Sequence, residues 1–378
     1  MPSLYKHQQS FLDKHLDKAL VCFDAGTGKT LTAVEWLRPR QGNAIVVVPK
    51  RIEDKWKKEL GDVKATVITK EQWKKTDFID PTALVIDEAQ FHSSGLFTKG
   101  RSQLATKTYN FIKKYPNMPV LLLTATPVSS TPANLHTLLC YIGVYVPWNK
   151  WREEFYNLMR LPYLPRPAWI PKPDWRTRIR PWLLKYAHIA LMGDCVEYLP
   201  PITEEVLKTP YKPLQQLSEL TPMGRFVEEH RNEQLEKGKV IREIGAEYRK
   251  VMVVAHFREQ IAQLEKELSK DKKVYVLHGG VKDQEAVIEQ AQEDDECFFL
   301  CQNQVGVGFD ADTFNVMIFA SQSYSYVSMV QMKARIRRIH ALKPVKYIYL
   351  QSGRCDKAVY KQLQLGKDFD VAEFTKTK

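Results

Sequence analysis

The sequence predicts an α/β protein with two doubly wound domains, each a parallel sheet with helices on both faces. Three observations support this prediction. Short strands rich in Val, Ile and Leu alternate with helical patterns, and the alternation occurs in two separate regions. The chain of 378 residues has the length of about two to three domains. The strands are also apolar along their whole length, which is typical of parallel sheets covered by helices.

The first alternating region lies in the N-terminal part of the chain. Its helices are expected at Lys29–Leu37 and Ile52–Leu60. Its strands are expected at Ala19–Phe23, Ala44–Val48, Thr66–Thr69, Ala83–Ile86 and Val120–Leu123. Each expected helix separates two of these strands, as the crossover of a parallel βαβ unit does.

The second alternating region repeats this pattern in the C-terminal part. Its helices are expected at Arg258–Ser269, Asp283–Glu293 and Tyr326–Arg338. Its strands are expected at Val251–Ala255, Val274–Leu277, Cys297–Leu300, Val316–Phe319 and Tyr347–Leu350. A second parallel sheet follows from the same argument.

A segment of different composition separates the two regions. Residues 150–185 contain four tryptophans, six prolines, and nine Lys or Arg against three acids. Proline interrupts regular elements, so we expect a folded insertion with short helices here. Residues 222–249 have a charged helical pattern. The predicted organisation is a domain at 1–145, a basic Trp/Pro-rich insertion and bridge at 146–205, and a second domain at 206–378.

The composition is that of an ordinary globular protein with a basic excess. Lys and Arg total 56 and Asp and Glu total 44, a net charge of +12 that favours a polyanionic partner. None of the six cysteines forms a CxxC pair, so we expect reduced core thiols and a cytoplasmic protein. Neither a membrane-spanning apolar run nor the apolar centre of a signal peptide is present, so no membrane partner is expected.

A glycine-rich segment, Gly26–Thr30, follows the first strand and precedes the first helix. Glycines let backbone N–H groups curl around phosphate oxygens, and the helix N-terminus favours negative charge. Lys29 would reach the β and γ phosphates, and the Thr30 hydroxyl would bind Mg²⁺. Phe23 stands where the strict phosphate-loop pattern has its first glycine. The alternative is a βα turn that binds nothing.

Two acids, Asp87 and Glu88, follow the strand Ala83–Ile86. Side chains at the carboxyl end of a parallel strand point into the ligand crevice. Asp87 would hold Mg²⁺, and Glu88 would position or deprotonate the attacking water. The alternative is that the two acids begin a solvated loop.

Ten segments, taken in chain order, resemble the motifs of superfamily-two helicases and, among them, the Swi/Snf-type DNA translocases. They are Tyr5–Gln8, Asp24–Thr30, Val46–Arg51, Ile68–Glu71, Asp87–Gln90, Leu123–Pro127, Leu199–Pro201, Val251–Phe257, Gln302–Asp310 and Gln331–Arg338. This family also lacks the first glycine of the phosphate loop. The resemblance covers almost the whole chain and implies two RecA-like domains with ATP and Mg²⁺ as cofactors.

The resemblance implies a role for each matching residue of the nucleotide site. The catalytic residues would be Lys29, Asp87, Glu88, Arg335 and Arg338, and the metal ligands would be Thr30 and Asp87. The nucleotide-binding residues would be Gln8, Asp24, Ala25, Gly26, Thr27, Gly28, Lys29, Thr30, Gly308, Asp310 and Gln331. Asp310 stands where many family members have Asn, which is a departure from the pattern.

The last motif also has a direct physical interpretation. Arg335 and Arg338 are three residues apart on an expected helix, so they would share one face. Two guanidinium groups on one face are able to clamp a transferring phosphoryl group. The alternative is a basic helix face in solvent.

A motor that steps along any sequence needs contacts to phosphates rather than to base edges. The candidate nucleic-acid residues are Lys50, Arg51, Thr69, Lys70, Thr126, Arg176, Arg178, Arg180, His278, Gly279, Asn303 and Gln304. His278 is equally well explained as a strand-end histidine that is satisfied locally, and Thr126 has a similar alternative. The tryptophans of the insertion either stack on bases or form its core, and we favour the core for most of them.

These observations predict a DNA-dependent ATPase that translocates on duplex DNA and remodels forked or branched DNA. One alternative is a strand-separating helicase on DNA or RNA, with RNA the less favoured substrate. Another is a nucleotide-gated binding module with little turnover. Partners from replication or recombination, and the cytoplasm of a bacterial or phage-infected cell, are expected.

Overall fold

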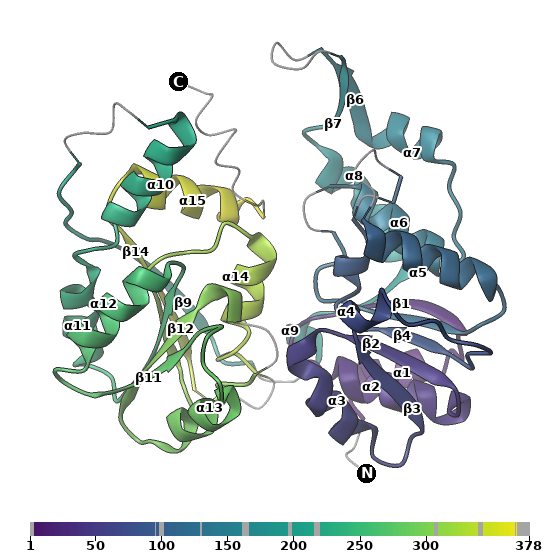
Figure 1. The fold of residues 1–378 in the computed structure, drawn as a ribbon, viewed down its shortest axis with the longest axis horizontal. Coiled ribbons are helices and arrows are strands. Elements are labelled where there is room, and N and C mark those ends of the chain that lie inside the picture. Colours follow the sequence, from purple (N-terminus) through teal and green to yellow (C-terminus); the bar gives the residue numbers. More distant parts are fainter. Residues whose placement is uncertain are drawn as a thin grey trace. The chain divides into compact units, whose positions relative to one another are not determined.

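The computed structural model divides the chain into two compact units, Met1–Glu197 and Tyr198–Lys378 (Figure 1). It describes residues 4–94, 96–97, 102–128, 131–160, 166–195, 199–214, 220–305, 309–338, 343–366 and 368. Gly308 of the predicted nucleotide site lies outside these residues. Among the residues described, no helix combines the length and the apolar character needed to cross a membrane.

The first unit contains a six-stranded sheet in the order β3-β2-β4-β5-β1-β8, and every pair of neighbours is parallel. The strands are β1 Lys18–Phe23, β2 Ala44–Val48, β3 Ala65–Thr69, β4 Leu84–Ile86, β5 Val120–Leu123 and β8 Ala187–Ala190. The helices are α1 Lys6–Leu12, α2 Lys29–Leu37, α3 Glu53–Leu60, α4 Lys70–Trp73, α5 Gln103–Lys114, α6 Ala133–Tyr141, α7 Trp148–Phe155, α8 Trp175–Tyr186 and α9 Met192–Cys195. The predicted parallel α/β fold is confirmed.

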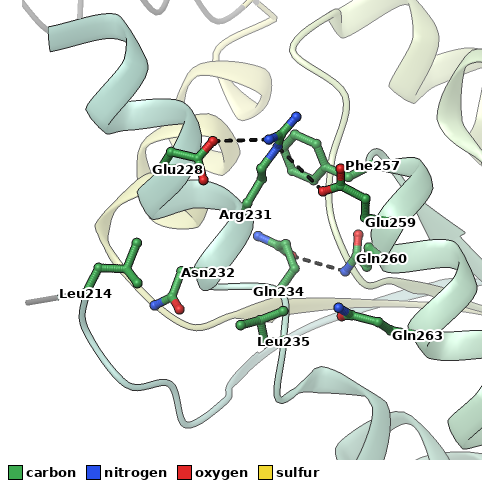
Figure 2. A pocket seen from close by; sticks show the side chains of 10 residues that line it. All are labelled: Leu214, Glu228, Arg231, Asn232, Gln234, Leu235, Phe257, Glu259, Gln260 and Gln263. Carbon is green, nitrogen blue, oxygen red and sulfur yellow. Dashed lines mark hydrogen bonds and ion pairs between the residues drawn. The ribbon is translucent and has the colours of Figure 1, made fainter. Parts of the chain in front are cut away.

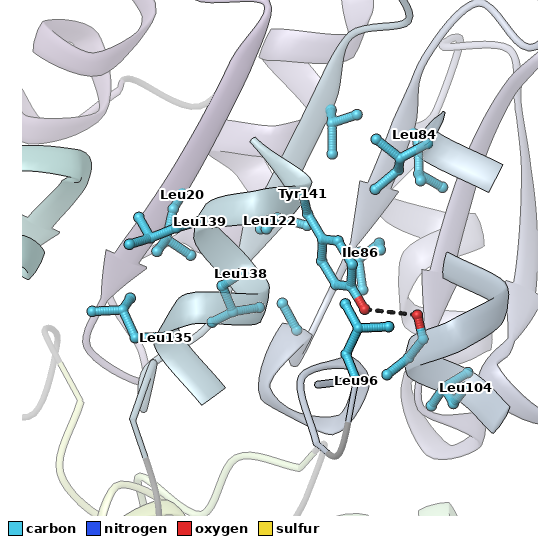
Figure 3. Packing of buried hydrophobic residues seen from close by; sticks show 14 of the residues in the cluster. Leu20, Leu84, Ile86, Leu96, Leu104, Leu122, Leu135, Leu138, Leu139 and Tyr141 are labelled. Carbon is cyan, nitrogen blue, oxygen red and sulfur yellow. Dashed lines mark hydrogen bonds between the residues drawn. The ribbon is translucent and has the colours of Figure 1, made fainter. Parts of the chain in front are cut away.

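Alternation along the strands builds a separate apolar core on each face of this sheet. Leu20 of β1 packs with helices α5 and α6, whereas its neighbour Val21 packs with α2 and α3. Successive side chains of a strand point to opposite faces, so a strand buried on both faces must be apolar at every position. Figure 3 shows the first of these cores, where Leu138 and Tyr141 of α6 lie against strand residues such as Leu122.

The basic insertion folds as part of the first unit. Helices α7 and α8 flank an antiparallel hairpin made of β6 Tyr156–Met159 and β7 Ala168–Pro171. Trp151 and Trp175 are buried in the core shared with α6, and Trp182 packs against it. Trp169 is 37% exposed. As expected, most of these tryptophans form core, and one does not.

The second unit contains another all-parallel sheet, in the order β11-β12-β10-β13-β14-β9. Its strands are β9 Ile202–Lys208, β10 Lys250–Ala255, β11 Lys273–Leu277, β12 Cys297–Gln302, β13 Val316–Phe319 and β14 Val345–Gln351. Its helices are α10 Pro222–Asn232, α11 Lys237–Gly245, α12 Arg258–Leu268, α13 Gln284–Glu293, α14 Tyr326–Lys333 and α15 Arg354–Gln364. All six cysteines of the chain are free, and four of them are buried.

Three features differ from the sequence prediction. Edge strands β8 and β9 were not expected, because their residues are partly exposed and lack a continuous apolar run. The helix expected to reach Arg338 ends at Lys333. The Arg335 N–H instead donates to the Met332 carbonyl in a turn, and the Arg335 carbonyl accepts the Ala311 N–H. The prediction that both arginines lie on one helix is therefore wrong.

Candidate functional site

The carboxyl edge of the first sheet collects most of the predicted site residues of that unit. Because the strands are parallel, the loops that follow them emerge at the same edge. Residues 24–30 follow β1, Lys50 and Arg51 follow β2, Lys70 follows β3, Asp87 and Glu88 follow β4, and Thr126 follows β5. The topology thus brings together segments that are about a hundred residues apart in the chain.

The glycine-rich loop after β1 is shaped by Gly26 and Gly28, both at φ +83°. A Cβ atom at Gly28 would lie 2.4 Å from Nε2 of Gln8, so a side chain has no room there. The fully buried Gln8 amide donates to the Gly28 carbonyl (2.9 Å) and accepts the Tyr5 N–H (2.7 Å). Gln8 therefore holds the loop against helix α1.

The ammonium group of Lys29 lies against the backbone of the same loop. It donates to the carbonyls of Phe23 and Asp24, both at 2.9 Å. The Thr27 hydroxyl donates to the Asp24 carbonyl at 2.7 Å, and an Asp24 carboxylate oxygen accepts the Met192 N–H at 2.9 Å. These contacts tie the loop to α9. Ala25 and Thr30 are partly exposed.

Asp87 is a buried carboxylate whose hydrogen-bond donors, among the residues that the structure describes, are neutral. Its Oδ2 accepts the indole N–H of Trp56 and its Oδ1 accepts the Glu88 N–H, both at 2.8 Å. Burial, with the charge of Glu88 adding to it, raises the pKa of Asp87 to about 6, against the lowering effects of Trp56 and Lys29. A carboxylate in this state gains from a nearby cation.

Glu88 is connected to the loop after β5 by a chain of hydrogen bonds. Its backbone is left-handed (φ 51°, ψ 51°), and its Oε2 accepts the Gln90 amide at 2.5 Å. Gln90 accepts the Thr124 hydroxyl at 2.7 Å, and Thr124 accepts the Thr126 N–H at 2.9 Å. Sequence reasoning assigned no role to Gln90, although its place in the Asp-Glu-Ala-Gln motif was the available signal.

The predicted nucleic-acid residues of this edge differ in exposure. Lys50 is exposed and pairs with Glu53 at 2.7 Å, and Arg51 is also exposed, although partial desolvation of its guanidinium group lowers its pKa. The Lys70 ammonium lies 4.6 Å from the centroid of the Phe91 ring. Thr69 is 3% exposed, and its hydroxyl accepts the Gln72 N–H at 3.2 Å as the cap of α4.

The arginines predicted in the insertion lie on α8, which leads into the amino end of β8, so they are not part of the carboxyl edge. Arg176 stacks 4.4 Å from the Trp175 ring centroid, Arg178 pairs with Asp174 at 2.7 Å, and Arg180 is exposed. Residues two apart on a helix do not share a face, so Arg178 points away from the other two.

The carboxyl edge of the second sheet carries the remaining candidates. His278 and the exposed Gly279 follow β11, and the Nδ1 atom of His278 accepts the Gly280 N–H at 3.0 Å. Asn303 and the exposed Gln304 follow β12. Asn303 is 2% exposed and donates to the Ser321 carbonyl at 3.0 Å. The hydrogen bond from Gly280 thus occupies one of the two ring nitrogens of His278.

Arg335 and Arg338 meet at one loop even though they are not on a helix. Arg335 donates to the Phe309 carbonyl at 2.5 Å, and Arg338 donates to the same carbonyl at 3.3 Å and pairs with Asp310. Burial lowers the pKa of Arg338 to about 10, so it stays charged at neutral pH. Gln331, one turn earlier, is 4% exposed.

A buried polar network under this edge was not predicted from the sequence. Asn303 binds the Ser321 carbonyl, and the Ser321 hydroxyl donates to Gln260. Gln260 donates to Gln234 at 3.2 Å, in the wall of a pocket of about 240 Å³ (Figure 2). Gln234 in turn accepts the ammonium of the fully buried Lys237 at 2.7 Å. Helices α11 and α12 are thereby fixed to the strand ends.

Glu229, Glu233 and Cys355 lie close enough together to suggest a metal site, but the contacts indicate a helix cap. The carboxylate of Glu233 accepts the N–H groups of Cys355 (3.0 Å) and Asp356 (2.8 Å) at the start of α15. Burial raises the pKa of the Cys355 thiol far above its ordinary value, so the thiol stays protonated. A protonated thiol is a poor metal ligand.

Comparison with known proteins gives a family match in the second unit. Residues 236–340 match the model of the helicase conserved C-terminal domain. No curated protein sequence matches the chain significantly.

The comparison with solved structures gives three matches at low sequence identity, and two of them have a TM-score above 0.5. The Mycobacterium smegmatis helicase Lhr bound to ssDNA and AMP-PNP has a TM-score of 0.58 and 14% identity, and the match covers 96% of this chain and 48% of Lhr. The Pyrococcus furiosus Hef helicase domain has a TM-score of 0.53 and 13% identity, and the match covers 96% of this chain and 98% of the Hef chain. The Sulfolobus solfataricus SWI2/SNF2 ATPase core in complex with dsDNA has a TM-score of 0.44 and 14% identity, and the match covers 100% of this chain and 95% of the SWI2/SNF2 chain.

The family match and the fold lead to the same assignment. The family model describes the part of the second unit that contains Asn303, Gln331, Arg335 and Arg338. The fold similarity extends over both parallel sheets. These findings support the resemblance to superfamily-two helicases: residues 236–340 match the helicase conserved C-terminal domain, and the α/β fold is similar to that of the Lhr and Hef helicases.

Proposed function

We propose that the protein is a nucleic-acid-dependent ATPase that uses Mg²⁺ and ATP to translocate along duplex DNA. The observation that carries this proposal is the pair of acids at the end of β4, buried Asp87 and partly exposed Glu88, where the charge of Lys29 from the glycine-rich loop reaches Asp87. The hydrogen bonds from Glu88 to Thr126 add a route by which the nucleotide site senses the neighbouring strand ends. Translocation on duplex DNA, rather than another track, rests on the Swi/Snf-type motifs.

In this proposal, the backbone of residues 24–28 and the side chain of Lys29 bind the phosphates. Lys29 now binds two neutral carbonyls, and phosphate oxygens are stronger acceptors for an ammonium group. Gln8 has a second amide N–H beyond the one given to Gly28, and it would donate this hydrogen to the adenine ring.

The metal would be held by the Thr30 hydroxyl and the Asp87 carboxylate. An oxygen-only pair of ligands fits Mg²⁺, which typically takes one or two protein groups and completes its shell with phosphates and water. When bound, Mg²⁺ neutralises the charge that develops on the phosphates. The Trp56 N–H, at 2.8 Å from Asp87 Oδ2, orients the carboxylate.

Glu88 would accept a proton from the attacking water, and Gln90 would hold the Glu88 carboxylate in place. Arg335 and Arg338 would stabilise the charge on the transferred phosphoryl group. Arg338 would then exchange its present partner, Asp310, for a phosphoryl oxygen. Gln331 and Gly308 would complete the nucleotide contacts from the second unit.

Polar groups of the strand-end loops would grip the nucleic-acid backbone. In the first unit these would be the cations Lys50, Arg51 and Lys70, and in the second unit they would be Gln304, His278 and the backbone of Gly279. Thr69, Thr126 and Asn303 are nearly buried, so they would position these loops or expose one polar atom. Arg176, Arg178 and Arg180 would add phosphate contacts from α8.

The test is the rate of ATP hydrolysis without nucleic acid and with saturating duplex DNA, forked DNA, single-stranded DNA or RNA. We expect strong stimulation by DNA, with duplex or forked DNA ahead of RNA. Glu88→Gln should abolish turnover while ATP still binds, and Lys29→Ala should weaken ATP binding itself. Equal rates with and without nucleic acid would contradict the proposal. ATP-dependent DNA binding without turnover would support the binding-module alternative instead.

A further inference from the structure

The hairpin of β6 and β7 extends from the first unit beyond α7 and α8 (Figure 1) and carries an apolar pair on its surface. Leu158 and Trp169 are directly opposite each other in the antiparallel register. Side chains in such a pair share a face and lie about 5 Å apart at their Cβ atoms. Leu158 is 56% exposed, Trp169 is 37% exposed, and neighbouring Met159 is 45% exposed.

Trp169 is held in place by a cation rather than by a core. The guanidinium carbon of Arg152, on α7, lies 4.3 Å from the centroid of the Trp169 ring. Trp151 and Trp175 of the same insertion are buried at 0% and 7% exposure. Burial of a tryptophan removes a large apolar area from water, so a tryptophan left in solvent next to Leu158 is unusual for a purely structural hairpin.

The charge around this apolar pair identifies its partner. Arg160 follows β6 and Arg166 precedes β7, and both are exposed. Residues 150–185 hold nine Lys or Arg against three acids, which is half of the net charge of the chain. Unpaired nucleotides offer a flat apolar ring and an anionic group in each repeat, and sequence-independent single-strand sites combine aromatic side chains with cations in the same way.

We propose that the β6–β7 hairpin binds unpaired nucleotides of DNA, with bases against the Leu158–Trp169 pair and phosphates at Arg160 and Arg166. This inference rests on the proposed function, because it makes the hairpin the element that recognises the single-stranded part of a fork. The stack of Arg152 on Trp169 presents the ring in one orientation, which lowers the entropy cost of binding.

The first test is the affinity of the full chain for forked DNA and for a blunt duplex of equal length, without nucleotide. Trp169→Ala should weaken binding to the fork about tenfold or more, as removal of one stacked base does. Binding to the blunt duplex should change less than twofold, and Trp169→Phe should keep most of the fork affinity. Tyr145→Ala removes an aromatic ring that is 71% exposed outside the hairpin and is the matched control, with no change expected.

The second test separates bases from phosphates through salt dependence. Arg160→Ala combined with Arg166→Ala should lower the log–log salt slope of fork binding by up to ~0.7 for each single-strand phosphate that the variant no longer neutralises. Trp169→Ala should weaken fork binding at every salt concentration and leave the slope unchanged.

Equal fork affinities for wild type and Trp169→Ala would overturn the inference. So would equal reductions in affinity for fork and blunt duplex, or an effect of Trp169→Ala confined to binding of anionic lipid vesicles. If no form of DNA stimulates ATP hydrolysis by the wild type, the proposed function fails. If DNA stimulates hydrolysis and Trp169→Ala binds the fork as tightly as the wild type does, only the inference about the hairpin fails.

Discussion

Two buried aspartates, one in each unit, follow strand ends and have opposite electrostatic surroundings. Asp356 is 3% exposed and contacts the Lys237 ammonium at 2.6 Å and His230 Nε2 at 3.1 Å. Burial alone would raise the pKa of Asp356, but Lys237 and His230 hold it well below its ordinary range. Asp87 is 7% exposed and receives only N–H donors, and its pKa is raised to about 6.

The contrast distinguishes a structural carboxylate from a functional one. A buried charge whose partners are complete fixes the surrounding helices and has no remaining capacity for a ligand. A buried charge with incomplete partners destabilises the fold and persists where a ligand supplies the missing charge. By this criterion Asp356 has a structural role in the second unit, and Asp87 fits the metal site that we propose.

The largest expected effect concerns Arg338, which is buried and paired with an acid that is about half exposed. Arg338→Ala should lower kcat of the DNA-stimulated ATPase by about 10³ or more, because an arginine at the phosphoryl group stabilises only the transition state. DNA affinity should change little. Arg337→Ala is the matched control, and a comparable fall in kcat for it would argue against a specific role for Arg338. Steady-state rates at saturating DNA provide the measurement.

Next in size is the decrease in stability expected for Asp356→Ala. Lys237 would stay buried without its carboxylate, so the free energy of unfolding should fall by about 3–5 kcal/mol. Urea unfolding of the full chain measures the change. Asp271→Ala, which removes an exposed partner of Arg242, should cost less than about 1 kcal/mol. If the free energy of unfolding falls by a similar amount in both variants, the buried ion pair of Asp356 contributes no more to stability than an exposed one.

For Asp87→Asn we expect an increase in the free energy of unfolding, in contrast to the decrease expected for Asp356→Ala. The amide keeps an acceptor for Trp56 and removes a buried carboxylate whose folded-state pKa lies above its unfolded value. The free energy of unfolding at pH 7 should therefore rise by about 1–3 kcal/mol. ATP hydrolysis should fall more than about 100-fold, since even outer partners of metal ligands contribute up to that factor. If Asp87→Asn is active and less stable than the wild type, Asp87 has a structural role like that of Asp356.

The smallest expected effect concerns His92, a buried side chain that is neutral, and the effect is on the pH dependence of stability. His92 is 2% exposed beside Thr108, and burial, with Lys70 and Lys74 adding to it, lowers its pKa to about 3. The unfolded chain binds a proton at His92 below about pH 6.5, whereas the folded protein does not, so stability falls as pH decreases from there towards 3.

Protonation of His92 in the unfolded chain should make the free energy of unfolding fall by about 1.4 kcal/mol for each pH unit below 6.5. His92→Gln should remove this contribution from unfolding free energies measured between pH 6.5 and 4. His15→Gln, at an exposed position, should leave the pH dependence unchanged. An unaltered slope in His92→Gln would show that the imidazole is protonated in the folded protein.

The central strands of both sheets were predictable because burial on both faces demands continuous apolar runs such as Ala44–Val48 and Val316–Phe319. The same rule places Asp87 and Lys29 at strand ends. It fails at β9, whose residues are partly or fully exposed, and it has no signal for the burial of Lys237, a charged residue at the start of α11. The contact of Arg335 and Arg338 with one loop depends on a turn after Lys333, and helical spacing cannot predict it.

The left-handed backbone at Glu88 has an evolutionary consequence. A residue with a Cβ atom in this conformation carries about 1 kcal/mol or more of strain, which glycine would relieve. Selection for stability alone would therefore favour glycine at position 88, and selection for the proposed catalytic role of Glu88 would oppose it. Where a descendant of this protein needed the fold but not the motor, position 88 is where the acid would disappear first.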